Sequence, residues 1–207
     1  MIADVHGNRL ALAAVLDAAS IAATDLPAEL GDALSGQLRP AETFNMLEAT
    51  GTIALRGSHD RGVARHPSDK LGATGAFTRM WLSTAQCTAL CARPVTWCGE
   101  GILAMHALTA HDLTYVLHEA ARQGIRERLP LEVSAPLPDG RLVMNHGSVG
   151  LPAYANTTPH ARWAMLKRQG ATWRAQFHAI PYDWAAAQAA SHGRQDWPQA
   201  LATGTLH

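Results

Sequence analysis

Short apolar runs that end in polar residues alternate with helical patterns along the first half of the chain. The first run, "MIAD", has the pattern of a strand that ends at Asp4. Apolar residues at positions 12, 15, 16 and 19 then follow the spacing i, i+3, i+4, i+7, which predicts a helix from Arg9 onward. Asn8 is a suitable N-cap for that helix, because its side-chain oxygen can accept a hydrogen bond from a first-turn N–H. These residues therefore predict a strand, an Asp-x-His loop and a helix.

Similar patterns predict the elements that follow. Pro40 suits the first turn of a helix over residues 40–49, since its missing N–H would have no partner there. Residues 161–183 alternate in a way that favours a β-hairpin turning near Gln169 and Gly170. The other predictions are strands at 52–55 and in the run "GILAMHA" that leads to His106, a helix over 112–129, a strand that breaks into a glycine-rich loop at 140–150, and an alanine-rich helix and tail after Pro181.

Four of the apolar runs end in residues that can bind a metal ion. In α/β sheets, ligands gather outside the carboxyl ends of the strands, so neighbouring strands would bring these residues into one crevice. We therefore predict that they converge. In chain order they are Asp4 and His6, Asp32, His59 and Asp60, and His106.

Length and composition describe one soluble globular unit. The 207 residues predict a single domain over 1–207, with 47% hydrophobic and 16% charged residues. Lys plus Arg (17) equals Asp plus Glu (17), which argues against bulk binding of nucleic acid or of an anionic membrane. No run of 18 apolar residues predicts a membrane span, and the first residues lack the pattern of a secretory signal. The expected location is the cytoplasm.

Three cysteines lie within twelve residues, at Cys87, Cys91 and Cys98. A zinc site would need a fourth ligand at matching spacing, and none is evident. We expect these thiols to act as small apolar side chains in a reducing environment.

The ordered set of polar strand ends resembles the motifs of the calcineurin-like metallophosphoesterases, in particular their small prokaryotic phosphodiesterase branch. The matching stretches are Asp4-Val5-His6-Gly7-Asn8, Gly31-Asp32 with Gly36, Gly57-Ser58-His59-Asp60, Met105-His106, a loop at 145–152 similar to the branch's Asn-Pro-Gly-Ser-Val-Gly loop, and the closing "IPYDW" at 180–184.

The resemblance implies a fold and a dinuclear metal site. The fold would be α/β, a four-layer α/β/β/α sandwich with two mixed sheets. Asp4 and His6 would bind the first metal ion, Asp32 would bridge both ions, and His106 would bind the second. The two divalent cations would be Mn, Fe, Zn or Ni, since mixed nitrogen and oxygen ligands suit all four.

The resemblance also assigns residues to the substrate. His59 would lie beside the phosphate as the catalytic acid of the leaving oxygen, with Asp60 orienting it. Asn8 and Arg61 are candidate phosphate contacts, although a helix cap and a surface charge are the commoner roles for such residues. The substrate would be a small phosphoester or nucleotide-like molecule, and homo-oligomerisation is left open.

Three departures from the family pattern are Ser58, the absent Gly-His-x-His motif and the short first run "MIAD", and the first two weaken the predicted metal site. Ser58 stands where the family has an Asn ligand, so we retain Ser58 as a metal contact that reaches the ion through water at best. No Gly-His-x-His motif exists in the chain, which predicts a missing strand and an irregular stretch over 124–138. His146 replaces the family Pro in the 145–152 loop, and we expect a surface histidine there rather than one that reaches inward.

Two functions remain open from the sequence. The first is metal-dependent hydrolysis of phosphomonoester or phosphodiester bonds by a phosphatase or phosphodiesterase with a weakened site. The second is a catalytically impaired member of the family that acts as a binding or scaffold protein. Metal content after purification distinguishes them.

Overall fold

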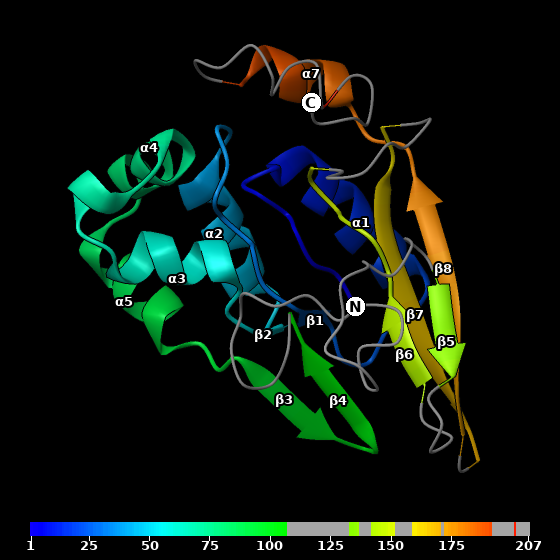
Figure 1. Ribbon diagram of the computed structural model, residues 1–207. Helices are drawn as coiled ribbons and strands as arrows, with labels where there is room; N and C mark the ends of the chain where they lie inside the picture. The colour runs from blue at the N-terminus through cyan, green and yellow to red at the C-terminus, as the bar shows by residue number, and fades with distance from the viewer. Residues whose placement is uncertain (107–132, 137–141, 152–158, 171, 192–200, 202–207) are drawn as a thin grey trace.

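A computed structural model of the chain describes residues 1–106, 133–136, 142–151, 159–170, 172–191 and 201. Figure 1 shows a long hairpin of strands on one side, a group of helices on the other, and helix α1 between them. In chain order the elements are α1 (Arg9–Ile21), β1 (Ala28–Glu29), α2 (Pro40–Ala49), β2 (Ile53–Ala54), α3 (Ser58–Arg65), the 3₁₀ turn η1 (Ser68–Lys70), α4 (Ala73–Trp81), α5 (Thr84–Ala92), β3 (Thr96–Gly99), β4 (Ile102–Met105), β5 (Val133–Pro136), β6 (Leu142–Asn145), β7 (Ala161–Gln169), β8 (Thr172–Ile180) and α7 (Trp184–Ala189).

A small parallel sheet lies at the centre. β1 pairs in parallel with β2, and Ile2 bridges Glu29 from the other side, also in parallel. The N–H of Ile2 donates to the carbonyl of Ala28, and the N–H of Leu30 donates to that of Ile2. The carboxyl ends of these segments therefore lie side by side, as the sequence predicted.

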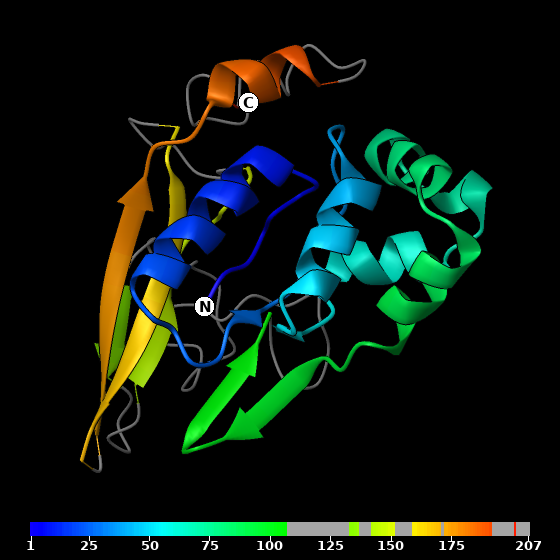
Figure 2. The same ribbon diagram turned by 180° about the vertical axis from the view of Figure 1, so that it is seen from behind.

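The other described strands form antiparallel pairs. They are β3 with β4, β5 with β6, and β7 with β8. In the long β7–β8 hairpin Gln169 pairs with Thr172, which confirms the predicted turn. Figure 2 shows α1 lying against this hairpin, and Leu12 and Val15 of α1 share the main core with Trp163 of β7.

The predicted helix boundaries of the first half agree with the structure. α1 starts at Arg9, and the Asn8 side chain accepts a hydrogen bond from the Ala11 N–H. α2 runs from Pro40 to Ala49, with Pro40 in its first turn. In the "GSHD" stretch Gly57 is the N-cap of α3, which begins at Ser58 and carries Asp60 in its first turn.

One prediction about the missing strand is wrong. The stretch 124–138 was expected to be irregular, yet Val133–Pro136 forms β5 and pairs in register with Leu142–Asn145. A proline within a short run argues against a strand in a sequence, and Pro136 is the last residue of this four-residue strand. The remainder of 124–138, the predicted helix at 112–129 and most of the tail after α7 lie outside the described residues.

The fold class is mixed α/β, as predicted. The four-layer arrangement with two mixed sheets and the single domain over 1–207 stay predictions. Within the described part of the chain, no helix has the length and apolar character to cross a lipid bilayer.

Candidate metal centre

The Asp-x-His loop is held against the turn that carries Asp32. Asp4 donates its N–H to the Gly31 carbonyl (3.0 Å), and His6 donates its N–H to the Asp32 carbonyl (3.1 Å). On the other side, the Gly150 N–H and the Ser148 hydroxyl both donate to the Asp4 carbonyl. Backbone hydrogen bonds from two distant segments thus fix where the first two candidate ligands lie.

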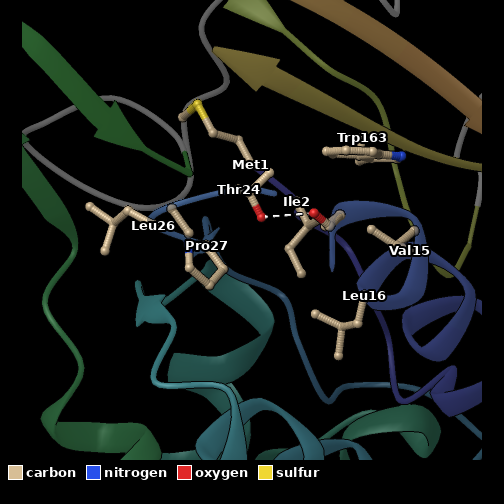
Figure 3. A pocket seen from close by; sticks show the side chains of 10 residues that line it. Met1, Ile2, Val15, Leu16, Thr24, Leu26, Pro27 and Trp163 are labelled. Carbon is tan, nitrogen blue, oxygen red and sulfur yellow. Dashed lines mark hydrogen bonds between the residues drawn. The ribbon is translucent and has the colours of Figure 1, made fainter. Parts of the chain in front are cut away.

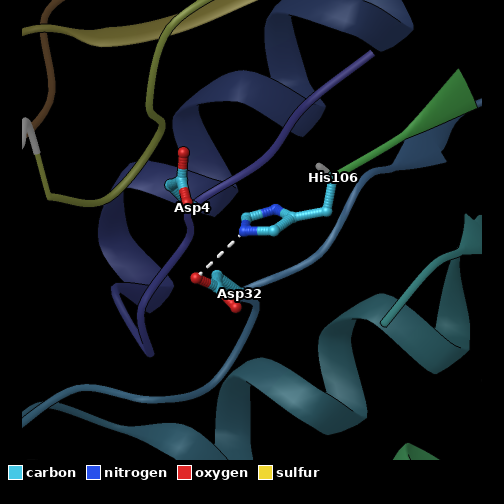
Figure 4. A group of neighbouring side chains, drawn as sticks. All are labelled: Asp4, Asp32 and His106. Atoms are coloured by element: carbon cyan, nitrogen blue, oxygen red, sulfur yellow. Dashed lines mark ion pairs between the residues drawn. The ribbon is translucent and has the colours of Figure 1, made fainter. Parts of the chain in front are cut away.

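Asp4, Asp32 and His106 bring their ligand atoms together (Figure 4). One oxygen or nitrogen atom from each lies within 4.8 Å of those of the other two. His106 Nε2 is 3.2 Å from Asp32 Oδ2, and both side chains are almost completely buried. The predicted convergence of these strand ends is therefore observed, whereas their role as metal ligands stays a prediction.

Three candidate ligands have an unfavourable backbone conformation. Among the described residues, five other than glycine have a positive φ, and Asp4 (53°), His6 (50°) and Asp32 (57°) are three of them. Such residues are uncommon, and they cluster at functional sites because the surrounding structure must enforce them. Three residues of the candidate site thus share a backbone conformation that the surrounding structure has to hold.

His6 is oriented by a residue that the sequence reasoning missed. Its Nδ1 lies 2.6 Å from the buried carbonyl of Ser35, which can only accept, so Nδ1 donates a hydrogen bond there. Nε2 is 3.7 Å from Asp4 Oδ1, so this nitrogen faces the candidate site. The Gly-Asp motif with a serine in the following turn was the available signal, but serine is common in turns.

The same serine lies beside His59. The Ser35 hydroxyl is 3.4 Å from His59 Nδ1, and the rings of His6 and His59 meet edge to face at 5.7 Å between centroids. His59 is exposed at the start of α3, so a substrate can reach its imidazole. Ser35 therefore links the candidate metal ligand to the candidate acid.

Asp60 does not orient His59, contrary to the sequence interpretation. Its side chain is fully buried, and Oδ2 accepts hydrogen bonds from the N–H groups of Asp32 (2.8 Å), Ala33 (3.4 Å) and Gly57 (3.1 Å). Burial raises its pKa above the usual range, and the nearby Asp32 carboxylate adds to the effect. Asp60 joins α3 to the Asp32 turn, which is a structural task that its position after a histidine does not reveal.

The charges of the cluster balance one another. Burial would raise the pKa of Asp32, but His106 and the other imidazoles hold it well below its usual range. Burial would conversely lower the pKa of His106, and Asp32, Asp4 and Asp60 outweigh it and raise the pKa to about 10. Burial keeps the pKa of Asp4 raised although His106 and His6 oppose it. Asp32 and His106 thus form a charged pair within the cluster.

The predicted site residues that remain are Asn8, which is buried, and Ser58 and Arg61, which are half-buried. Asn8 is buried, and its amide donates to the Gly150 carbonyl (2.9 Å) and the Tyr182 hydroxyl (3.2 Å), which commits it to the fold and disfavours phosphate contact. Ser58 and Arg61 are half-buried in α3, next to His59 and Asp60. Their predicted roles stay predictions.

His146 corrects another expectation. It is 4% exposed rather than on the surface, and burial lowers its pKa to about 3. Its loop is drawn inward because Ser148 and Gly150 bind the backbone of Asp4. A histidine next to glycine suggests an exposed loop, and the sequence does not display the hydrogen bond between Ser148 of this loop and Asp4, which are 144 positions apart.

A small hollow in the described part of the chain lies away from the candidate centre. The hollow has a volume of about 30 Å³ and lies between α1 and the start of β1. Figure 3 shows the side chains that line it, among them Val15, Leu26 and Trp163. None of the candidate site residues lines it. It offers packing space rather than reactive groups.

A divalent cation suits the donor set of the candidate centre. Two carboxylates and two imidazoles provide the mixed oxygen and nitrogen ligands that Mn, Fe, Zn and Ni accept. His106 Nε2 lies 3.2 Å from Asp32 Oδ2, and His6 Nε2 lies 3.7 Å from Asp4 Oδ1, so both imidazoles face the carboxyl groups that would share the ion. The residues present therefore fit the metal that the sequence resemblance implies.

Solved structures share this fold. The chain is similar to a metallophosphoesterase from Sphaerobacter thermophilus, with 23% identity, a TM-score of 0.80 and coverage of 98% of both chains. It is also similar to the hypothetical protein PH1004 from Pyrococcus horikoshii OT3, with 18% identity, a TM-score of 0.77 and coverage of 98% of this chain and 96% of that one. No protein-family model and no curated protein matches the chain. The chain thus has a metallophosphoesterase-like fold, as the motifs predicted.

Proposed function

We propose that the protein is a metal-dependent phosphoesterase that hydrolyses phosphomonoester or phosphodiester bonds at the Asp4, Asp32 and His106 centre. The observation that carries the proposal is the meeting of these three strand-end side chains, whose candidate ligand atoms lie within 4.8 Å of one another. The metallophosphoesterase-like fold supports it at the level of the family. The finer expectations belong to the same proposal: a four-layer sandwich, manganese as a suitable ion, a small phosphoester as substrate and the cytoplasm as location.

Asp4, His6 and Asp32 would hold one cation, and Asp32 and His106 would hold a second with help from Ser58. A divalent cation in such a site lowers the pKa of bound water and neutralises charge on the phosphate. The backbone contacts of Asp4 and Asp32 would keep both carboxylates in place before substrate arrives. Ser35 would hold His6 so that Nε2 faces the ion.

His59 would complete the reaction as the acid. Hydrolysis forms a bond between a water oxygen and phosphorus while the bond to the leaving oxygen breaks, and that oxygen needs a proton. His59 is the exposed histidine beside the cluster, so its imidazole would donate this proton. It would then regain a proton from solvent.

The test is hydrolysis of an aryl phosphodiester, bis(p-nitrophenyl) phosphate, with and without added Mn²⁺. We expect slow turnover that rises with Mn²⁺ and disappears with a chelator. Asp32→Asn should abolish it, whereas Asp25→Asn, which changes an exposed carboxylate outside the cluster, should not. Metal binding without turnover on mono- and diesters would favour the impaired binding or scaffold protein instead.

A further inference from the structure

A buried glutamate lies three residues before Asp32, where the parallel sheet ends. Glu29 is 0% exposed, and its backbone pairs with Ile2 on one side and with Ala54 on the other. Strands with neighbours on both sides are usually apolar, and glutamate is rarely buried unless it has partners. Burial raises the pKa of Glu29 to about 8, although Arg93 opposes this shift. A buried carboxyl group in the central strand is unfavourable unless it has hydrogen-bond partners.

The reason lies in the turn that follows β1. Gly31 (φ 112°) and Asp32 (φ 57°) both have left-handed backbones, so the chain leaves the strand direction there. The Gly31 N–H donates to Glu29 Oε1 at 2.7 Å. The next two N–H groups, of Asp32 and Ala33, donate to Asp60. Two buried acids thus hold three consecutive N–H groups of the turn.

The other oxygen of Glu29 is anchored to the helices. Arg93, which follows α5, places Nη1 3.5 Å from Glu29 Oε2 and Nη2 3.2 Å from Glu48 of α2. The guanidinium is itself buried and lies 5.7 Å from the ring centroid of Phe44. Rotation of the Glu29 side chain would therefore break its contact with Arg93, which is itself held by Glu48 of α2.

We infer that Glu29 is a positioning residue that fixes the Gly31–Asp32 turn, and with it the Asp32 carboxylate, from inside the sheet. The inference deepens the proposed function, on which its meaning for catalysis rests. The contact with Gly31 needs only an acceptor oxygen, which the ionised and the protonated carboxyl group both provide. Arg93 acts through Glu29 by holding its second oxygen.

Substitutions at Glu29 separate positioning from stability. Glu29→Gln keeps an acceptor for Gly31, whereas Glu29→Met has a similar length and no acceptor. Because Glu29→Met leaves Arg93 buried without this partner, the double variant Glu29→Met/Arg93→Met serves if the single one fails to fold. Leu90→Ala is the matched control, because it removes a fully buried side chain of α5 and so destabilises the core while it keeps the Glu29 carboxyl group and the Arg93 side chain.

Two readouts test the inference. The first is the dissociation constant for Mn²⁺ alone, by calorimetry on folded protein. We expect Glu29→Met and the double variant to bind about 10–100-fold more weakly, the usual effect of losing a partner of a ligand, and Glu29→Gln and Leu90→Ala to stay near wild type. The second is hydrogen exchange of the Gly31 amide without metal, expected to be about 2–10-fold faster in the Met variants only.

The outcomes distinguish the two proposals. Wild-type protein that binds no Mn²⁺ would contradict the proposed function, and amide exchange would still decide the role of Glu29. Folded Met variants with wild-type exchange at Gly31 would overturn the inference. So would an equal loss of Mn²⁺ affinity in Leu90→Ala, because the effect would then follow stability rather than position.

Discussion

The two halves of the candidate centre are built differently. The first, around Asp4, His6 and Asp32, is held by backbone contacts to Gly31, by the Ser35 carbonyl, and by the buried carboxyl groups of Glu29 and Asp60. The second, around His106 and Ser58, depends in the described part of the chain on one imidazole at the end of β4 and on the Asp32 that it shares. Hydrogen bonds to the candidate ligands thus fix their positions more firmly in the first half than in the second. We therefore predict that two ions would bind with unequal affinity.

Gly57→Ala should displace Asp32 and so weaken the first half of the candidate centre. A Cβ at Gly57 would overlap Asp32 Oδ1 and the Asp32 backbone, so the turn would have to move. We expect Mn²⁺ affinity and phosphodiester turnover to fall by more than about 100-fold, beyond the usual effect of losing a ligand's partner. Gly72→Ala is the control, because a Cβ there meets no atom within 4 Å. Equal Mn²⁺ affinity of Gly57→Ala and Gly72→Ala would contradict the claim that the position of the Asp32 turn determines binding in the first half.

Ser58→Asn should strengthen the second half. An amide oxygen reaches farther than a hydroxyl and suits a divalent cation, so the weaker ion should bind about 10–100-fold more tightly. The measurement is calorimetric titration with Mn²⁺, resolved into two steps. Ser68→Asn, an exposed serine in η1, is the matched control. An unchanged second step would mean that Ser58 does not face the ion.

Glu29→Gln should change how stability depends on pH. The folded protein raises the pKa of Glu29 from 4.5 to about 8, so the folded state holds this proton more tightly than the unfolded chain. Its contribution is therefore complete below about pH 4.5 and is lost as pH rises to about 8. Relative to wild type, the Gln variant should gain roughly 1–3 kcal/mol in free energy of unfolding between pH 5 and 8. Urea unfolding at both pH values measures it, and parallel pH profiles would contradict it.

Ser35→Ala should give the smallest effect, because it removes the hydroxyl beside His59 and keeps the carbonyl that holds His6. The loss of one hydrogen bond of about 0.5–1.5 kcal/mol predicts a turnover about 2–10-fold lower, with Mn²⁺ affinity unchanged. A matching fall in Mn²⁺ affinity would show that the hydroxyl supports the metal ligand as well.

Local patterns in the sequence were sufficient for much of the fold. Pro40 and Asn8 mark helix starts by their own chemistry, and the alternation around Gln169 marks the hairpin. The convergence of Asp4, Asp32 and His106 followed from their shared place at strand ends. These features depend on neighbours in the chain, which a sequence displays directly.

The features that the sequence did not reveal depend on distant contacts. Asp60 looks like a partner of His59 but binds backbone groups 27 and 28 positions away. Ser35 and Glu29 occupy unremarkable positions until the fold brings His6 and Arg93 to them. His146 is buried because its loop packs on Asp4. The side chains that support a site are thus harder to predict than the ligands themselves.

The number of tightly bound ions tests the account most directly. We propose measuring the Mn²⁺ content of purified protein by elemental analysis after loading and gel filtration, beside Asp32→Asn and Ser58→Asn. The account predicts at most one retained ion per chain in wild type, none in Asp32→Asn, and more in Ser58→Asn. Two fully occupied ions in wild type, or the same content in Asp32→Asn, would contradict it.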